Sequence, residues 1–409
     1  MQRRLLAILP SNLKPDNNAG HKRFFTMLQL LVKKYHIEVA TRWDERPGTS
    51  FFTADQISSY QEKLRLIGIE TIANNPAELL NALASKQYDL IVFEFYETAE
   101  KYLRLCRLLQ PDARLLVDSV DVHYLREASG VATGHYPSVQ VETTKQAELS
   151  VYRRSDMVIL ITNIEHEAML KEGGMPPMPI IPIVMDTVER SVVTRKQEIV
   201  FIGGFAHKPN ADGIMWFFSK IWNRVRERIP EATLTIIGSN PTPEIIALND
   251  SPGISVEGFV PEVGPFLDRA AVSIAPLRFG GGMKGKVTEA MAHGIPVVST
   301  SFGVQGFTVR NGIQMIVADD PESFSEGVIS LLLDPARAEM IGMAGRDLMA
   351  QFCTLPNVEI KMLELTEAVL NAPTRIKPTL ASRIAGSAVR LGVPLSAGIL
   401  PLVKRIIRR

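Results

Sequence analysis

Short runs of apolar and β-branched residues alternate with helix-like stretches along almost the whole chain, and this alternation limits the possible folds more than any other feature. In the first half, the runs that we predict to be strands span residues 4–9, 37–41, 90–93, 114–118, 157–161 and 180–183. Between them, the stretches 140–154 and 164–171 carry apolar residues at helical intervals. Strands that alternate with helices predict an α/β fold, in which parallel sheets are covered by helices.

The same pattern occurs twice along the chain. It is interrupted at residues 186–196, after a proline cluster, and resumes with predicted strands at 199–202, 233–237, 254–257, 272–275 and 296–299. Because a domain holds about 150 residues, a chain of 409 residues is expected to form two domains. We predict a Rossmann-like N-terminal domain over residues 1–188, a Rossmann-like C-terminal domain over 189–355, a helix over 356–372 that crosses back to the N-terminal domain, and a basic tail over 373–409.

The composition excludes several other classes of protein. A hydrophobic content of 46% and a charged content of 22% are typical of a globular protein that buries a core. Cys106 and Cys353 are far apart and have no Cys or His nearby at metal-ligand spacing, so we predict neither a disulfide framework nor a zinc site. No apolar run approaches the roughly 18 residues that span a bilayer, and the first strand is too short for a secretion signal. We expect a cytoplasmic protein that is not integral to a membrane.

A glycine-rich segment after the predicted strand 272–275 is the best candidate for a binding site. Gly280, Gly281 and Gly282 are followed by Lys284 and Lys286 at the start of a predicted helix. Glycines let the backbone approach a phosphate closely, and a helix start offers unpaired N–H groups and about half a positive charge. Ligands of parallel sheets bind outside the carboxyl ends of the strands. The segment therefore predicts a diphosphate site at the mouth of the second sheet.

Two nucleotide-binding patterns fit this segment only in part. Gly280, Gly282 and Gly285 match G-x-G-x-x-G, but the acidic residue expected about 20 positions later is missing, which disfavours a nicotinamide cofactor. A phosphate-binding loop of ATPases would need Ser or Thr where Val287 stands. The third possibility is that the glycines merely allow a tight turn against the sheet.

Four segments of the sequence resemble retaining family-4 glycosyltransferases, in particular those that assemble polysaccharides. They are residues 286–300 (KVTEAMAHGIPVVST), 201–210 (FIGGFAHKPN), 257–261 (EGFVP) and, in the first half, 118–126 (DSVDVHYLR). The resemblance implies the GT-B architecture, in which two Rossmann-like domains face each other across a cleft. It also implies that the N-terminal domain binds the acceptor and the C-terminal domain binds a nucleotide-sugar donor.

The resemblance assigns roles to individual residues. Glu289 would bind the hydroxyls of the nucleotide ribose, Lys208 and Lys286 would neutralise the diphosphate, and His123 would contact the donor sugar or the acceptor; these four are the predicted catalytic residues. The other predicted donor-binding residues are Gly20, Gly204, Phe259, Val260, Gly280, Gly281, Gly282, Met283 and Lys284. Asp121 and Arg126 are secondary candidates. Without the resemblance, His123 would be interpreted as a loop histidine bonded to Asp121, and Arg126 as a surface or capping charge.

One position departs from the pattern of the family. Many relatives carry a second glutamate, which contacts the donor sugar, eight positions before the first, and this chain has Gly281 there. We predict a metal-independent, hexosyltransferase-like enzyme that transfers a sugar, with retention, to a glycan or lipid-linked saccharide in the synthesis of cell-surface polysaccharide. No cofactor, metal or nucleic acid is expected. A nucleotide-sugar epimerase and a non-catalytic protein that binds sugar nucleotides are the alternatives.

The tail carries all of its charge with one sign. Eight basic residues and no acidic residue follow Glu367, namely Arg375, Lys377, Arg383, Arg390, Lys404, Arg405, Arg408 and Arg409. Since the net charge of the whole chain is +1, about −7 is left for the rest. An anionic leaflet contributes up to about 1 kcal/mol per basic residue near its surface. The tail therefore predicts either peripheral attachment to the inner face of the membrane or a solvated segment.

Overall fold

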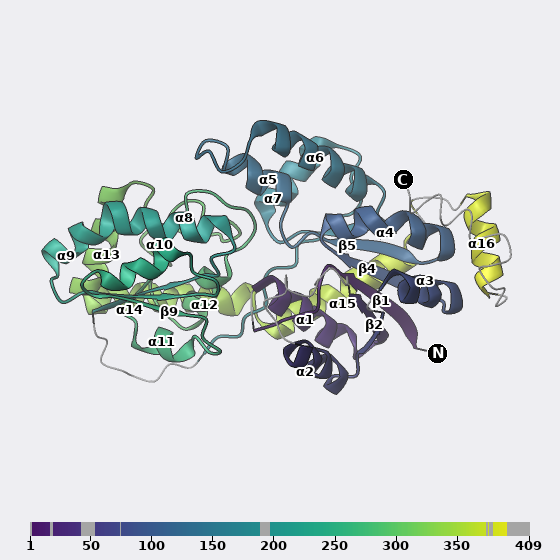
Figure 1. Cartoon of the computed structure of the whole chain (residues 1–409), viewed down its shortest axis with the longest axis horizontal. Coiled ribbons are helices and arrows are strands. Elements are labelled where there is room, and N and C mark those ends of the chain that lie inside the picture. Colours follow the sequence, from purple (N-terminus) through teal and green to yellow (C-terminus); the bar gives the residue numbers. More distant parts are fainter. Residues whose placement is uncertain are drawn as a thin grey trace.

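The computed structural model describes residues 2–16, 19–41, 54–73, 75–188, 197–373, 375 and 379–390. These residues form two lobes that lie side by side, each built around one parallel sheet (Figure 1). The first sheet takes its strands from the first half of the chain, and the second sheet takes its strands from residue 198 onward. The predicted α/β fold with two Rossmann-like halves is confirmed.

The first sheet has the strand order β3-β2-β1-β4-β5-β6, and all its pairs are parallel. Its strands are β1 (Arg3–Leu9), β2 (Tyr35–Thr41), β3 (Glu70–Ala73), β4 (Leu90–Glu94), β5 (Arg114–Asp118) and β6 (Met157–Ile159). Leu5 of β1 is in register with Ile37 of β2 on one side and with Leu90 of β4 on the other. Helices cover both faces of such a sheet, which is why its central strands are nearly continuous apolar runs.

The second sheet repeats this winding with the order β12-β11-β10-β7-β8-β9. Its strands are β7 (Glu198–Ile202), β8 (Thr233–Ile237), β9 (Ile254–Gly258), β10 (Val272–Ala275), β11 (Val297–Ser299) and β12 (Ile316–Val317). In each sheet the first strand lies at the centre, beside the fourth strand of its half. Ligands of doubly wound sheets bind at this point, where the strand order reverses.

Helices pack on both sheets. Those of the first half are α1 (Ala19–Leu31), α2 (Ala54–Leu66), α3 (Pro76–Ser85), α4 (Tyr96–Leu109), α5 (His123–Ser129), α6 (Ser138–Arg153) and α7 (Asn163–Glu172). Those of the second half are α8 (Lys208–Phe217), the π-helical η1 (Phe218–Trp222), α9 (Asn223–Arg228), α10 (Pro243–Ile246), the 3₁₀ turn η2 (Ala247–Asp250), α11 (Gly264–Arg269), α12 (Gly285–Ala292), α13 (Pro321–Leu333) and α14 (Pro335–Phe352). Within the described ranges, no helix is both long and apolar enough to span a bilayer.

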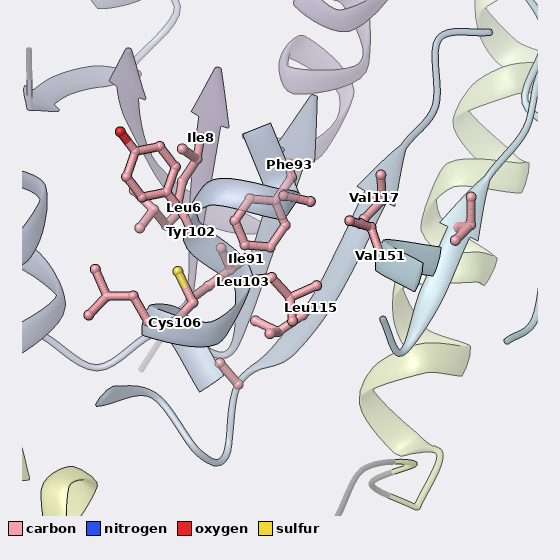
Figure 2. Close-up of a cluster of buried hydrophobic side chains, with 14 of the residues drawn as sticks. Leu6, Ile8, Ile91, Phe93, Tyr102, Leu103, Cys106, Leu115, Val117 and Val151 are labelled. Carbon is pink, nitrogen blue, oxygen red and sulfur yellow. The ribbon is translucent and has the colours of Figure 1, made fainter. Parts of the chain in front are cut away.

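The core of the first lobe shows how the amphipathic pattern is used. Figure 2 shows Leu6 and Ile8 of β1 and Phe93 of β4 close to Tyr102 and Cys106 of α4. Cys106 is fully buried, and burial raises the pKa of its thiol. The second lobe has an equivalent core, in which Phe217 and Phe324 meet edge to face with ring centroids 6.0 Å apart.

One predicted strand is wrong and two strands were missed. Residues 180–183 form no strand, although Ile181 N donates to Leu160 O and Ile180 bridges to Leu160. Pro182 has no N–H to donate, and neither do Pro177 and Pro179 just before this segment. The missed strands, β3 and β12, lie at the edges of their sheets; β3 has four residues, two of them polar, and β12 has only two residues. Residues 189–196, which the predicted domain boundary includes, lie outside the described residues.

Two further described helices follow α14, namely α15 (Leu355–Asn371) and α16 (Leu380–Arg390). α15 packs on the first lobe, where Val358, Met362 and Leu365 belong to the same buried cluster as residues of β1 and α1. The chain thus passes between the lobes twice, and the two passages are bonded together. Met185 N donates to Cys353 O at 2.8 Å, and Leu355 N donates to Asp186 Oδ1 at 3.1 Å.

Candidate functional site

A cavity of about 1110 Å³ lies between the lobes, at the carboxyl ends of the strands of both sheets. The first lobe lines it with the start of α1 and with the loops that follow β4 and β5. The second lobe contributes the loops after β7, β8, β9 and β10 and the first turns of α12. The cavity therefore joins the strand-reversal points of both sheets, where doubly wound folds bind ligands.

Two helix N-termini meet in this cavity. α12 begins at Gly285 and α1 at Ala19, and both residues line the cavity. They are so close that a Cβ on Gly285 would lie 2.4 Å from Ala19 Cβ, so only glycine fits there. Gly282, just before α12, has a φ of 64°, which also favours glycine. A helix start carries partial positive charge, so two helix starts side by side make this part of the cavity suited to an anion.

The two lysines of the glycine-rich segment have different surroundings. Lys284 is buried, and its Nζ donates to the carbonyl oxygens of Gly281 and Gly282, both at 2.7 Å. Lys286 lines the cavity, and its Nζ donates to Asn210 Oδ1 at 2.5 Å. Burial and the charge of Lys284 lower the pKa of Lys286 to about 7, so an anion in the cavity would find a lysine ready to take up a proton. Lys284 therefore holds the glycine run in place, and Lys286 is the lysine that a ligand in the cavity can contact.

Glu289 lies one turn further along α12 and also lines the cavity. Its Oε1 is 4.0 Å from Nζ of Lys22 on α1, which is the nearest cation across the cleft. Burial raises the pKa of Glu289, and Lys22 opposes this effect. A partly shielded carboxylate on a rigid helix is well placed to accept hydrogen bonds from hydroxyl groups.

Most of the predicted donor-binding residues line the same cavity. They are Gly20, Gly204, Phe259, Val260, Gly281, Gly282, Met283 and Lys284. Three predicted site residues lie outside its lining, namely Gly280, Lys208 and His123. Gly280 is bonded to Ser129 of the first lobe, and Lys208 is exposed with its Nζ 4.8 Å from the ring centroid of Tyr136. In this structure Lys208 therefore lies on a contact between the lobes.

His123 lies behind the cavity wall in a cluster of charged side chains. Its Nδ1 is 3.0 Å from Glu97 Oε1, and its Nε2 is 3.3 Å from Asp121 Oδ1. Burial opposes the charge on His123, but these two carboxylates raise its pKa to about 10. Asp121, which does line the cavity, accepts from Arg126 at 2.9 and 2.6 Å. The structure thus brings His123, Asp121 and Arg126 together, and Asp121 and Arg126 are the members that face the cavity.

Three further residues of the site were not singled out from the sequence. Lys22 faces Glu289 across the cleft, Asn210 accepts a hydrogen bond from Lys286, and His207 lines the cavity. Although the cleft leaves His207 exposed to water, desolvation by the surrounding protein and the cations Lys286 and Arg126 lower its pKa to about 4. Asn210 and His207 lie within the segment 201–210, so polar residues directly after a predicted strand could have marked them as site residues. No feature of the sequence marks Lys22.

Among the residues that the structure describes, no group of three or more His, Cys, Asp or Glu side chains is arranged to hold a metal ion.

Comparison with known proteins identifies the second half and the fold. Residues 196–334 match the family described as glycosyl transferases group 1. An uncharacterised 44.6 kDa protein of the cps region of Klebsiella pneumoniae is 21% identical over 344 residues, which cover 77% of this chain and 87% of that protein. The match to glycosyl transferases group 1 thus lies within the second half of the chain.

Two solved structures resemble the whole chain. Sucrose-phosphate synthase from Thermosynechococcus elongatus superposes with a TM-score of 0.69 at 15% identity, over 91% of this chain and 100% of that one. Anabaena HepE in complex with UDP and glucose gives 0.66 at 13% identity, over 90% and 100%. At such low identity the likeness concerns the fold alone, and that fold is GT-B.

Proposed function

We propose that this protein is a glycosyltransferase that moves a sugar from a nucleoside diphosphate to a glycan or a lipid-linked saccharide. The observation that carries the proposal is the meeting of two helix N-termini with Lys286 in a cavity shared by both lobes. Breaking the bond between sugar and diphosphate leaves negative charge on the departing phosphate, and these groups are placed to stabilise it. The match to glycosyl transferases group 1 and the likeness to HepE, whose structure was solved in complex with UDP and glucose, support a nucleotide-sugar as donor.

The roles of individual residues follow from this proposal. Lys286 and the first turns of α1 and α12 hold the diphosphate, and Glu289 accepts hydrogen bonds from the ribose hydroxyls. Phe259 and Val260, on the loop after β9, lie beside the base. Transfer then depends on holding donor and acceptor in line across the cleft. Retention at the anomeric carbon, independence of metal ions and a role in cell-surface polysaccharide belong to the proposal, and the cps-region relative supports the last of these.

A thermal-shift screen tests donor binding. UDP, GDP and ADP and their common sugar derivatives are added to the purified protein, and a ligand at 100 times its dissociation constant stabilises by about 2.7 kcal/mol. Glu289→Gln keeps the size of the side chain and removes its charge, so we expect the shift to be lost or strongly reduced. Glu364→Gln, on the exposed side of α15, is the matched control. An unchanged shift with Glu289→Gln would contradict the assignment of Glu289.

Product analysis separates the proposed activity from the alternatives. A transferase yields a glycosylated acceptor and a nucleoside diphosphate, an epimerase yields an isomeric sugar nucleotide, and a binding protein yields neither. NMR of the new glycosidic bond tests retention. Addition of EDTA tests metal independence, for which we expect undiminished activity.

The basic tail is tested separately. We propose that it attaches the protein to anionic membrane, since up to about 1 kcal/mol per basic residue is available at such a surface. Removing residues 391–409 deletes Lys404, Arg405, Arg408 and Arg409 and leaves α16 intact. We expect wild type, and not the truncated protein, to co-sediment with phosphatidylserine vesicles at low salt. Equal sedimentation of wild type and the truncated protein would show that residues 391–409 do not attach the protein to the membrane.

A further inference from the structure

At one end of the cavity the glycine run, Gly280 to Gly282, faces the first lobe. What we infer there rests on the proposed function. A Cβ on Gly281 would lie 2.9 Å from Arg126 Cβ and 3.3 Å from Asp121 Oδ2. A Cβ on Gly282 would lie 3.0 Å from Asp121 Cβ. The space that side chains of the glycine run would take is therefore filled from the opposite lobe. Arg126 and Asp121 fill it together, and the carboxylate of Asp121 is the charged group within it that lies nearest to Gly281.

The turn that presents Asp121 has an unusual backbone. Val120 has a φ of 59°, in the left-handed region that a β-branched residue rarely adopts. Asp121 N donates to Ser119 O at 2.6 Å, which closes a three-residue turn with Val120 at its centre. A turn of this type with positive φ is rare and strained, and such strain persists where the surrounding structure demands it. Here the turn directs Asp121 toward the second lobe.

Its neighbours keep Asp121 ionised. Burial opposes the charge, but Arg126, His123 and His207 together hold the pKa of Asp121 well below its ordinary value. A carboxylate has about four acceptor positions. Arg126 NH1 bonds to both oxygens, and His123 Nε2 approaches Oδ1, so Oδ2 keeps an acceptor position for a ligand.

The glycine run leads directly into the start of α12, where the diphosphate is proposed to bind. Gly281 and Asp121 line the same cavity as Gly285 and Lys286. We propose that Asp121 accepts a hydrogen bond from a hydroxyl of the donor sugar, so that the first lobe supplies the carboxylate of the donor-sugar site. Arg126 and His123 are the positioning residues that orient this carboxylate.

Isothermal titration with UDP, UDP-glucose, UDP-galactose and UDP-N-acetylglucosamine tests the proposal on the full chain. Asp121→Asn removes the charge and keeps the shape. We expect UDP to bind as tightly as to wild type or up to threefold more tightly, because a negative charge near the diphosphate is lost. The sugar nucleotide that wild type binds best should be weakened tenfold or more. Asp112→Asn, an exposed change at the opposite end of β5, is the matched control and should alter neither.

Gly281→Ala gives a second variant that removes no charge. Its added methyl group meets Arg126 and Asp121 and displaces them, so the same selective loss of the sugar nucleotide is expected. If either folded variant changes the affinities for UDP and for that sugar nucleotide by the same factor, Asp121 does not contact the sugar and the inference is overturned. If wild type binds none of the four ligands, the UDP-dependent form of the proposed function fails as well, and this result is distinct from a selective effect.

Discussion

At the scale of single residues, Lys286 links ligand binding to pH. Its pKa of about 7 in the free protein is lowered by burial and by Lys284, and a bound diphosphate would raise it again. Binding therefore takes up a proton at pH values above 7. We expect the affinity for UDP to be highest below pH 7 and to fall by up to about tenfold per pH unit above it.

Titration calorimetry at pH 8 in two buffers of different ionisation enthalpy measures this proton uptake. Lys286→Arg is the control, because a guanidinium stays charged throughout this range. We expect the variant to bind UDP without proton uptake from this side chain. Proton uptake that is the same in wild type and variant would mean that Lys286 is already charged in the free protein.

The sequence predicted many of these residues but not how each is used. Lys286, Gly281 and Met283 were located in the site because glycine-rich turns and helix starts have recognisable sequences, and Glu289 because residues 286–300 resemble family-4 glycosyltransferases. The sequence did not predict that Lys284 folds back on the loop, since this depends on the path of the backbone in space. Nor did it place Asp121 against Gly281, because that contact joins residues 160 positions apart in separate lobes.

At the scale of elements, the start of α5 depends on a buried carboxylate. Glu148 of α6 is fully buried and accepts from His123 N and Tyr124 N, both at 3.1 Å, and from the hydroxyl of Tyr152 at 2.6 Å. Burial raises its pKa to about 7, although His123 and Tyr152 oppose the shift. This one carboxylate satisfies the first N–H groups of the helix that carries His123 and Arg126.

The raised pKa predicts a loss of stability with rising pH. Because the folded pKa lies above the unfolded value of 4.5, the stabilisation from protonated Glu148 is complete below pH 4.5 and is lost as the pH rises through 7. The difference amounts to at most about 3 kcal/mol. Glu148→Gln mimics the protonated form, so the melting temperature of wild type relative to this variant should fall between pH 5 and pH 8.

Thermal unfolding of both proteins at several pH values provides the measurement. Glu142→Gln, on the exposed side of the same helix, should show no such trend relative to wild type. A constant difference between wild type and Glu148→Gln across this range would contradict the shifted pKa.

Strands and helices were predicted best where buried apolar side chains recur at a regular interval along the sequence. The central strands of both sheets and the helices α6 and α7 lie within a few residues of their predicted ranges, and α7 begins with a capping box formed by Thr162 and Glu165. β3 and β12 were missed because an edge strand needs no continuous apolar run. The segment 180–183 was assigned to a strand because its apolar residues were given more weight than its prolines.

At the scale of the whole molecule, a second contact joins the lobes beside the cavity. Phe279 is fully buried, with its ring centroid 4.2 Å from that of His135. The N–H of the adjacent Gly280 donates to Ser129 Oγ at 2.9 Å. Phe279 of the second lobe therefore inserts into the loop that follows α5 of the first.

Removing this ring should weaken the association of the lobes. Truncation of a buried phenylalanine costs about 3–5 kcal/mol, so Phe279→Ala should populate a more open arrangement. UDP would then have to close the lobes, and its apparent affinity should fall by about tenfold or more. Small-angle scattering should show a larger radius of gyration without ligand. Leu333→Ala, at an exposed end of α13, should change neither quantity, and unchanged scattering and affinity for Phe279→Ala would show that the contact does not hold the lobes together.

The paired passages between the lobes determine which movements remain available to the molecule. Since Met185 is bonded to Cys353 and Asp186 to Leu355, both connections act as one double-stranded pivot. If one lobe slid along or twisted against the other, these hydrogen bonds would break. A hinge rotation of one lobe about the paired passages would leave them intact. The end of the chain also returns to the first lobe through α15, so whatever restrains the tail restrains that lobe. With the tail attached to a membrane as proposed, the second lobe is then the one that swings.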